Sequence, residues 1–389
     1  MQRFDIICPC HFGLEAVLKR EITDLGYEIA NVYDGRVIFH GDPEAVVYAN
    51  IHLRTAERVL IDCAEFEAKT FDELYEGVKS CNWSDLIPRD GRFWVKKASS
   101  VNSKLFSPRD IQSIVKKAIV DNLSGRYGIS HFPENGADHP LRVFINKDHV
   151  SIGLDTTGDS LHKRGYRPGA GEAPIAENLA AALIMLTPWR QDRYLIDPFC
   201  GSGTFPIEAA MIARNIAPGM DRHFTAENWD HIIDRRQWYD VADEARSNVI
   251  KDVETDIQGY DIDGKVIAVA RENAKRAGVL DMVHLQQREA RNLSHHGKYG
   301  FVITNPPYGE RLNDLDTLPG IYRDLGDAMK RLDTWSLYMI TSYEDAERYI
   351  GRKASKNRKI YNGMIKTRFL SFPGPKPVSK MSDNIMQSR

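Results

Sequence analysis

Residues 193–213 read RYLIDPFCGSGTFPIEAAMIA and contain an apolar run, a glycine-rich turn and a second apolar run. The first run is short and ends at the turn, which is typical of a buried strand, whereas the second has the length of a helix. Gly201 and Gly203 let the backbone turn sharply and approach a ligand that a Cβ atom would exclude. The spacing is neither that of a GxxxxGK[ST] phosphate loop nor that of a GxGxxG dinucleotide fingerprint. The stretch therefore predicts a strand, a tight turn and a helix.

The chain beyond this stretch alternates between strand and helix patterns. Strands are predicted at IQGYDID, MVHLQQ, YGFVIT and WSLYMITS, and helices at DGKVIAVARENAKRAG and GIYRDLGDAMKRL. This alternation predicts an α/β fold with a parallel sheet and right-handed crossovers, in which ligands bind at the carboxyl ends of the strands. The segment RKIYNGMIKTRFLSF adds a closing antiparallel hairpin, predicted to turn at Asn362–Gly363.

The sequence before residue 161 mixes alternating and helical segments and shows no catalytic constellation. Residues 1–65 predict one small α+β unit, and residues 66–160 a second one with a hairpin that turns at Lys147–Asp148. The segment LHKRGYRPGAGEAP predicts a linker, and a strongly apolar helix follows from Ile175 to Leu186. We therefore expect a third domain over residues 161–389.

An insertion lies between Ile216 and Ile257 and carries Phe224, Trp229 and Trp238. We interpret these three aromatic side chains as packing residues rather than as a platform on which bases stack.

The composition excludes several classes of protein. The chain has 389 residues, of which 42% are hydrophobic and 27% charged, as in soluble globular proteins. No run reaches the roughly 18 to 20 apolar residues of a membrane span, and the N-terminus lacks a secretory pattern, so we expect a cytoplasmic protein without a membrane partner. The five cysteines are scattered, which argues against a disulfide framework. Cys8, Cys10 and His11 resemble metal ligands, but Phe4, Ile6 and Cys8 form one face of a strand, and no metal is expected.

The distribution of charge matters more than the net charge of −2. Residues 96–126 hold seven Lys or Arg against two Asp, and residues 348–368 hold eight basic residues and no acidic one. Two such runs favour contacts with the phosphates of a nucleic acid. The predicted phosphate-binding residues are Lys96, Lys97, Lys104, Arg109, Lys116, Lys117, Lys163, Arg164, Arg167 and Arg311.

Acidic residues follow the predicted strands at the edge where a ligand would bind. Asp197 places a carboxylate where a cationic amino group could be held, and Asp261 can bind both hydroxyls of a ribose. Asp263 is interpreted as the N-cap of the next helix. Glu289 either accepts a hydrogen bond from an adenine amino group or simply faces solvent.

The segment Asn305-Pro-Pro-Tyr follows the strand FVIT. Pro306 and Pro307 hold the backbone extended, so that the Asn305 amide oxygen and the Pro306 carbonyl can both act as acceptors. Two acceptors that grip the two N–H bonds of an aromatic amine favour the pyramidal nitrogen whose lone pair can attack a methyl sulfonium. Tyr308 supplies a ring that can stack on an extruded base. The motif therefore predicts S-adenosylmethionine-dependent methylation of an exocyclic amino nitrogen.

Residues from about 165 to 372 resemble the class I methyltransferases, with DPFCGSGT as the cofactor loop and NPPY as the amine motif. LHKRGYR, the apolar helix, DPFCGSGTFPIEAA and NPPYGERL together resemble the THUMP-domain RNA methyltransferases, especially the guanine-N2 half of the large-subunit rRNA enzymes. The resemblance implies a Rossmann-like seven-stranded sheet preceded by a ferredoxin-like unit and a THUMP domain, and RNA, most of all rRNA, as the partner. It implies that Asn305, Pro306, Pro307 and Tyr308 are catalytic. It assigns cofactor contacts to Asp197, Phe199, Gly201, Gly203, Thr204, Asp261, Glu289 and Asn305.

The amine motif leaves the acceptor open. Guanine N2, adenine N6, cytosine N4 and a glutamine side-chain amide all present a suitable nitrogen. A DNA adenine methyltransferase would need a sequence-reading domain, and a glutamine methyltransferase would not need the two basic runs. We expect guanine N2 of 23S rRNA, with tRNA guanine N2 or adenine N6 of rRNA or DNA as alternatives.

Overall fold

The computed structural model describes residues 3–168, 175–309 and 316–377 of the chain. The chain forms two compact units. The N-terminal unit comprises Met1–Cys10, Leu14–Leu161 and Ala217–Ser247, and the C-terminal unit comprises His11–Gly13, His162–Ile216 and Asn248–Arg389. The chain therefore passes from one unit to the other after Cys10, Gly13, Leu161, Ile216 and Ser247.

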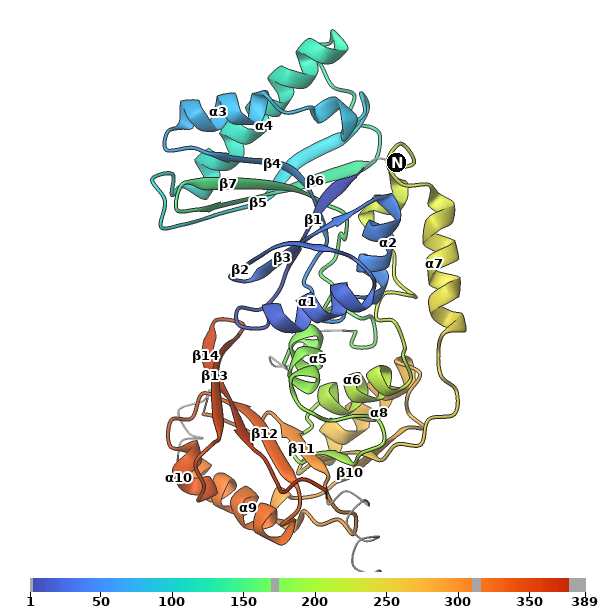
Figure 1. Cartoon of the computed structure of the whole chain (residues 1–389), viewed down its shortest axis with the longest axis vertical. Coiled ribbons are helices and arrows are strands. Elements are labelled where there is room, and N and C mark those ends of the chain that lie inside the picture. The colour runs from blue at the N-terminus through green and yellow to red at the C-terminus, as the bar shows by residue number, and fades with distance from the viewer. Residues whose placement is uncertain (1–2, 169–174, 310–315, 378–389) are drawn as a thin grey trace, which may run out of the picture. The chain divides into compact units, whose positions relative to one another are not determined.

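The N-terminal unit is built on a seven-stranded sheet with the order β2-β3-β1-β4-β7-β6-β5. Its strands are β1 (Phe4–Pro9), β2 (Ile29–Tyr33), β3 (Arg36–Gly41), β4 (Leu60–Glu67), β5 (Arg92–Val101), β6 (Asp138–Asn146) and β7 (His149–Asp155). The predicted domain boundary at residues 65 and 66 falls within β4, which pairs with β1 on one side and β7 on the other. The two predicted α+β units therefore share one sheet (Figure 1).

Local sequence explains the turns and caps of this unit. Lys147 and Asp148 both have positive φ (52° and 66°), which is the backbone of the tight hairpin turn predicted between β6 and β7. Ser107 caps the longest helix, Pro108 occupies its first turn, and Gly128 ends it in the left-handed conformation. The helices are α1 (Glu15–Asp24), α2 (Pro43–His52), α3 (Phe71–Lys79), α4 (Pro108–Tyr127) and α7 (Arg235–Ser247), with 3₁₀ turns at Trp83–Asp85 and Thr225–Asn228.

The insertion packs into the N-terminal unit. Phe224, Trp229 and Trp238 are at most 5% exposed and belong to its hydrophobic core, which confirms their interpretation as packing residues. The Trp229 ring stacks on His139 with 5.0 Å between centroids, and its Nε1 donates to the Asp138 carbonyl at 2.8 Å. A segment that leaves the α/β part of the sequence thus completes the core of the other unit.

The C-terminal unit contains a seven-stranded sheet with the order β10-β9-β8-β11-β12-β14-β13. The strands β8 (Leu195–Asp197), β9 (Ile257–Asp261), β10 (Val283–Gln287), β11 (Phe301–Thr304) and β12 (Ser336–Thr341) are parallel. β13 (Lys356–Asn362) and β14 (Ile365–Phe372) form an antiparallel hairpin at one edge. This arrangement confirms the predicted α/β fold and its closing hairpin. The two-residue turn is Gly363–Met364, one residue later than predicted, because Asn362 pairs with Ile365.

Helices cover both faces of this sheet. Figure 1 shows α9 (Leu318–Arg331) and α10 (Ala346–Ile350) on one face, and α5 (Glu177–Leu186), α6 (Thr204–Ala213) and α8 (Gly264–Arg276) on the other. A 3₁₀ turn follows β10 at Ala290–Asn292. The apolar helix predicted at Ile175–Leu186 is α5, and Leu179 to Ile184 are all buried. Because helices cover the faces of this sheet, a ligand is expected at the carboxyl ends of its parallel strands.

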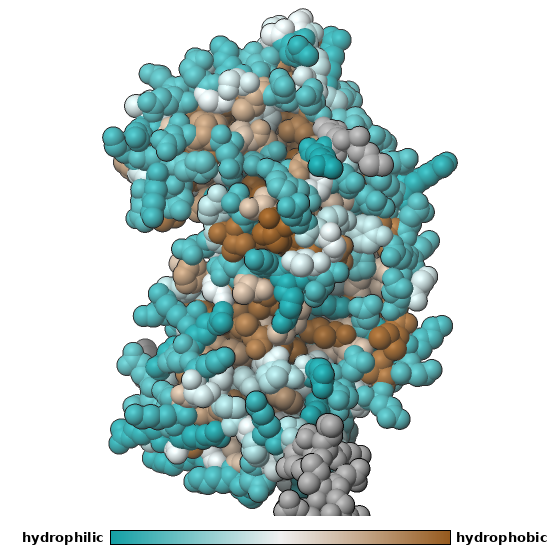
Figure 2. All heavy atoms as spheres, viewed as in Figure 1, coloured by the Kyte–Doolittle hydropathy of each residue, from teal (hydrophilic) through white to brown (hydrophobic). Residues whose placement is uncertain are grey.

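No helix within the described ranges has both the length and the hydropathy that crossing a bilayer requires. On the face drawn in Figure 2, hydrophilic side chains predominate and hydrophobic ones appear in separate groups. Phe4, Ile6 and Cys8 are buried together on β1, as the strand pattern predicted. In the part of the chain that the structure describes, no three His, Cys, Asp or Glu side chains gather into a metal-binding group.

Candidate active site at the carboxyl ends of the strands

The turn after β8 adopts the conformation for which glycine is needed. Gly201 and Gly203 have φ of +52° and +88°, where other residues are strained. A Cβ atom on Gly203 would also meet the Cβ of Ala270 at 3.1 Å, so this glycine allows α6 and α8 to approach. A Cβ on Gly201 would meet nothing within 4 Å and would point into open space. The predicted tight turn is confirmed, and Gly201 is the glycine on its open side.

Asp197 ends β8 as a buried carboxylate. Its side chain is 1% exposed, and Oδ1 accepts hydrogen bonds from Thr304 Oγ1 at 2.5 Å and from the Phe199 amide at 3.1 Å. Burial raises the pKa of Asp197 to about 7, although both hydrogen bonds act in the opposite direction. A cation placed beside this carboxylate would restore its ionised form. Asp197 therefore holds the turn and is also suited to a positively charged ligand group.

Asp261 connects two loops at the end of β9. Its Oδ2 accepts from the Gly201 amide at 3.1 Å, and its Oδ1 accepts from the Asp263 amide at 3.0 Å. The Asp263 side chain in turn accepts from the Lys265 amide at 2.8 Å, which confirms that Asp263 is the N-cap of α8. The carboxylate of Asp261 thus lies against the glycine turn, where the second predicted ligand-binding segment meets the first.

The Asn-Pro-Pro-Tyr segment follows β11 and contains one buried hydrogen-bond acceptor that has no donor among the described residues. The Asn305 Oδ1 atom is buried and has no hydrogen-bond partner within the described ranges. A buried carbonyl oxygen without a donor is costly, so such an atom is typical of a site that a ligand completes. Tyr322 of α9 donates its hydroxyl to the Pro307 carbonyl at 3.1 Å, and Asn362 Nδ2 donates to the Tyr308 hydroxyl at 3.0 Å. The backbone of the motif is therefore held by α9 at Pro307, and its tyrosine is held by β13 at the hydroxyl.

Two adjoining cavities surround these residues. One has a volume of about 450 Å³ and is lined by Asp197, Ser202 and Thr204. The other has a volume of about 580 Å³ and is lined by Asp261, Glu289 and Tyr308. The residues common to both cavities are Phe199, Gly201, Val266 and Asn305. All the predicted catalytic residues, and the predicted cofactor residues apart from Gly203, thus line one or both cavities.

Several residues of the larger cavity escaped the sequence motifs. Ile262, Val266, Ile321 and Asp324 line it, and Ile262 is 67% exposed although it follows a buried strand. Its position directly after Asp261 is the one local signal that could have identified it. Glu289 lines the same cavity and forms an ion pair with Arg291, so it faces the cavity rather than bulk solvent alone.

The structure corrects the assignment of two linker arginines to RNA. Arg164 is 7% exposed and forms an ion pair with Glu208 of α6, with 3.5 Å between Nε and Oε1. The Arg167 guanidinium forms a bidentate pair with Glu177, at 2.8 Å and 2.6 Å, and donates to Thr204 Oγ1 at 3.2 Å. Both guanidinium groups are therefore engaged inside the C-terminal unit, where they fasten the linker to α5 and α6. Lys163 is exposed, and Arg311 lies outside the described residues.

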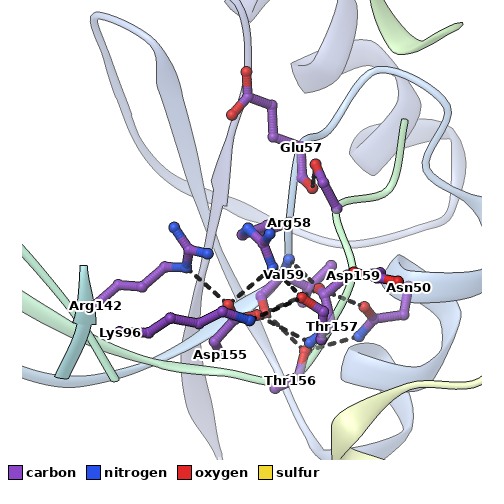
Figure 3. A network of polar contacts seen from close by, with 12 residues as sticks. Asn50, Glu57, Arg58, Val59, Lys96, Arg142, Asp155, Thr156, Thr157 and Asp159 are labelled. Carbon is purple, nitrogen blue, oxygen red and sulfur yellow. Dashed lines mark hydrogen bonds and ion pairs between the residues drawn. The ribbon is translucent and has the colours of Figure 1, made fainter. Parts of the chain in front are cut away.

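The basic run of the N-terminal unit lies on its surface. Its six predicted phosphate-binding side chains are all exposed: Lys96, Lys97, Lys104, Arg109, Lys116 and Lys117. β5 contains a bulge between Val95 and Lys97, which exposes two consecutive lysines. The Lys96 ammonium donates to the Gly158 carbonyl at 3.4 Å (Figure 3). Exposure is compatible with the predicted phosphate contacts.

A groove in the same unit contains the predicted Lys97 together with three arginines that the sequence did not reveal. It has a volume of about 290 Å³, and its lining includes Arg36, Arg58, Lys97 and Arg142. Arg58 and Arg142 both pair with the buried Asp155, at 2.9 Å and 2.7 Å, as Figure 3 shows. Lys97 and Arg142 are neighbours across β5 and β6, a pairing that only the strand register discloses.

Comparisons with known proteins agree with this geometry. Residues 5–60 match the family model described as the RlmL ferredoxin-like domain, residues 68–155 match the THUMP domain, and residues 164–370 match the RMKL-like methyltransferase domain. The chain is 43% identical to the Bacillus subtilis (strain 168) protein YpsC, whose assignment as an RNA methyltransferase is provisional, over 99% of this chain and 100% of that protein.

Two solved structures share the whole architecture. SMU.472, provisionally named a methyltransferase and solved in complex with SAH, is 41% identical with a TM-score of 0.90, over 97% of this chain and all of that one. A Listeria monocytogenes (strain 4b F2365) protein is 44% identical with a TM-score of 0.90, over 96% of this chain and 97% of that one. It carries the provisional name N6-adenine-specific DNA methylase. The family resemblance and the fold predicted from the sequence are confirmed.

Proposed function

Because the chain belongs to the RMKL-like methyltransferases that carry a ferredoxin-like and a THUMP domain, we propose that it methylates guanine N2 in 23S rRNA with S-adenosylmethionine as the donor. The observation that carries the amine chemistry is the buried Oδ1 of Asn305, which has no hydrogen-bond partner among the described residues. This acceptor lines both cavities, so a donor N–H of the substrate would complete it beside the cofactor.

The cofactor fits the residues that line the two cavities. Asp261 and Glu289 offer carboxylates for the ribose and adenine groups in the larger cavity, and Asp197 offers one for the amino group in the smaller cavity. When bound, S-adenosylmethionine would supply a positively charged methyl sulfonium, and transfer of its methyl group would leave a neutral thioether. Gly201 lets the backbone lie close to such a ligand, because no Cβ atom occupies the open side of the turn.

The protein contributes mainly position and fixed dipoles. Asn305 Oδ1 and the Pro306 carbonyl accept the two hydrogens of the amine, which keeps its lone pair out of conjugation and directed at the methyl group. The Tyr308 ring lies against one face of the base, and Tyr322 fixes the proline backbone through the Pro307 carbonyl. The methylated nitrogen is acidic while it is charged, so it loses a proton without a strong general base.

Asp324 supports guanine as the base. This exposed carboxylate of α9 lines the larger cavity together with Asn305 and Tyr308. Guanine presents its N1–H donor next to the N2 amine, whereas adenine presents an N1 acceptor next to the N6 amine. A carboxylate accepts hydrogen bonds and donates none, so it suits the guanine edge and opposes the adenine edge. The exposed lysines of the N-terminal unit and its arginine-lined groove suit the phosphates of an RNA partner.

The test is transfer of labelled methyl groups to separated rRNA and tRNA from a strain that lacks the gene, followed by nucleoside analysis. We expect label in N2-methylguanosine of 23S rRNA, and a loss of about a hundredfold or more in rate for Asn305→Ala, as for the removal of other transition-state hydrogen-bond partners. A cooperative denaturant melt with the midpoint of the wild type would show that the variant is folded. Label in N6-methyladenosine would refute the guanine assignment, and label confined to tRNA would refute the rRNA assignment.

A further inference from the structure

The hairpin of β13 and β14 presents a bare apolar side chain at its tip. Gly363 and Met364 form the turn, and Gly363 has a φ of +59°. The Met364 side chain is 97% exposed, compared with 80% for Phe106, the next most exposed large hydrophobic residue in the described ranges. Single exposed hydrophobic residues are common, so exposure alone assigns no role to Met364.

The hairpin tip is tied to the amine site by a hydrogen bond. Asn362 Nδ2 donates to the Tyr308 hydroxyl at 3.0 Å, and Tyr308 lines the larger cavity with Asn305. Met364 is thus two residues from a side chain that contacts the tyrosine assigned to the target base. A two-residue turn between paired strands leaves little freedom between Asn362 and Met364.

The strands that carry the tip are positively charged. β13 and β14 contain five Lys or Arg and no Asp or Glu, namely Lys356, Arg358, Lys359, Lys366 and Arg368. Lys356, Lys359 and Lys366 are exposed along the hairpin, and the Lys359 ammonium lies 5.1 Å from the centre of the Tyr361 ring. An exposed apolar tip on a cationic hairpin suits a partner that offers phosphates around an apolar gap.

Extrusion of a base creates such a gap. A base that moves from its stack into an enzyme pocket loses contact with both neighbours, and proteins that open base steps insert Met, Leu, Phe or Pro side chains between them. We propose that Met364 enters the RNA stack in place of the base held by Asn305 and Tyr308, while the hairpin lysines contact the flanking phosphates. This inference rests on the proposed function, since it requires an RNA substrate at the amine site.

The experiment compares two RNAs once the target nucleotide is mapped. One is a transcript of the target region, and the other is the same transcript with an abasic nucleotide beside the target, which removes one stacking partner. Met364→Ala is expected to lower kcat/KM about tenfold on the intact transcript and less than about threefold on the abasic one, because stacking costs a few kcal/mol per step. Met364→Leu should retain most of the activity on both.

Controls separate this inference from the proposed function. Leu280→Ala removes another exposed side chain of the same unit, 42% exposed and located before β10 at the opposite strand end, and should leave both rates unchanged. Equal rates for wild type and Met364→Ala on both transcripts, or an equal loss on both, would overturn the role of Met364 while the proposed function stands. A wild-type protein that labels no RNA would overturn the proposed function itself.

Discussion

Cofactor affinity should decrease as the pH falls below about 7, because one buried carboxylate must be ionised to hold the cofactor amino group. Asp197 lines the smaller cavity, and burial raises its pKa to about 7. Asp197 is then ionised in half of the free protein at pH 7 and in about one part in eleven at pH 6. If only the ionised form holds the ammonium group, affinity falls about fivefold over this interval.

Folding has the opposite dependence on pH. The pKa of Asp197 in the native state lies above its ordinary value of 3.8, so the native protein binds this proton more tightly than the unfolded chain. The contribution of Asp197 to stability is therefore largest below about pH 4 and is lost as the pH rises through about 7. Weaker cofactor binding at pH 6 would therefore not result from a loss of folding stability caused by Asp197.

Calorimetry with S-adenosylhomocysteine at pH 6 and 7 measures the affinity and the number of protons released on binding. The wild type should show the fivefold change and should release close to one proton per ligand bound at pH 6, measured in buffers of different ionisation enthalpy. Asp197→Asn should bind more weakly at pH 7 and lose both the pH dependence and the proton release. Affinity of the wild type that changes less than about twofold, or proton release that persists in Asp197→Asn, would refute the reasoning.

Three further outcomes test the structural assignments. Arg164→Ala should lower the free energy of unfolding by about 3 to 5 kcal/mol, because it removes the cationic partner of the buried Glu208 carboxylate. Denaturant melts measure this loss, and an unchanged stability would restore Arg164 as a candidate for RNA contact. Charge reversal of Lys116 and Lys117 should weaken RNA binding and reduce its salt dependence by about two counterions. Filter binding at several salt concentrations measures both effects, and unchanged RNA affinity would exclude these two lysines from the RNA contact. Tyr322→Phe should lower kcat with little change in KM, by a factor equivalent to about 1 kcal/mol, because the proline backbone loses one donor; steady-state kinetics that match the wild type would show that this bond is dispensable.

Local sequence patterns predicted the parts of the fold that depend on local chemistry. The turn at Lys147–Asp148 and the N-cap at Asp263 follow from side chains and backbone within a few residues of each other. The glycine turn before α6 follows from the same kind of evidence. The motif residues line adjoining cavities because the carboxyl ends of parallel strands share one edge, and fold class and motif order together predicted this convergence.

Features that depend on distant residues escaped prediction. Arg164 resembles a surface arginine in the sequence, but Glu208 lies 44 positions away and meets it only in the folded chain. The groove that includes Arg142 depends on strand register, and the exposure of Lys96 depends on a bulge. The place of Asp324 in the larger cavity likewise depends on how α9 packs, which periodicity does not encode.

The return of residues 217–247 to the N-terminal unit has a consequence for dissecting this protein. A fragment ending at Leu161 would lack Trp229, whose indole ring stacks on His139. The loss of this ring would leave a solvent-filled cavity in the core of the fragment. A fragment starting at His162 would carry Phe224, Trp229 and Trp238 without the core that shelters them. Either half produced alone should therefore aggregate and have low stability. The shortest stable and active fragment should include both units.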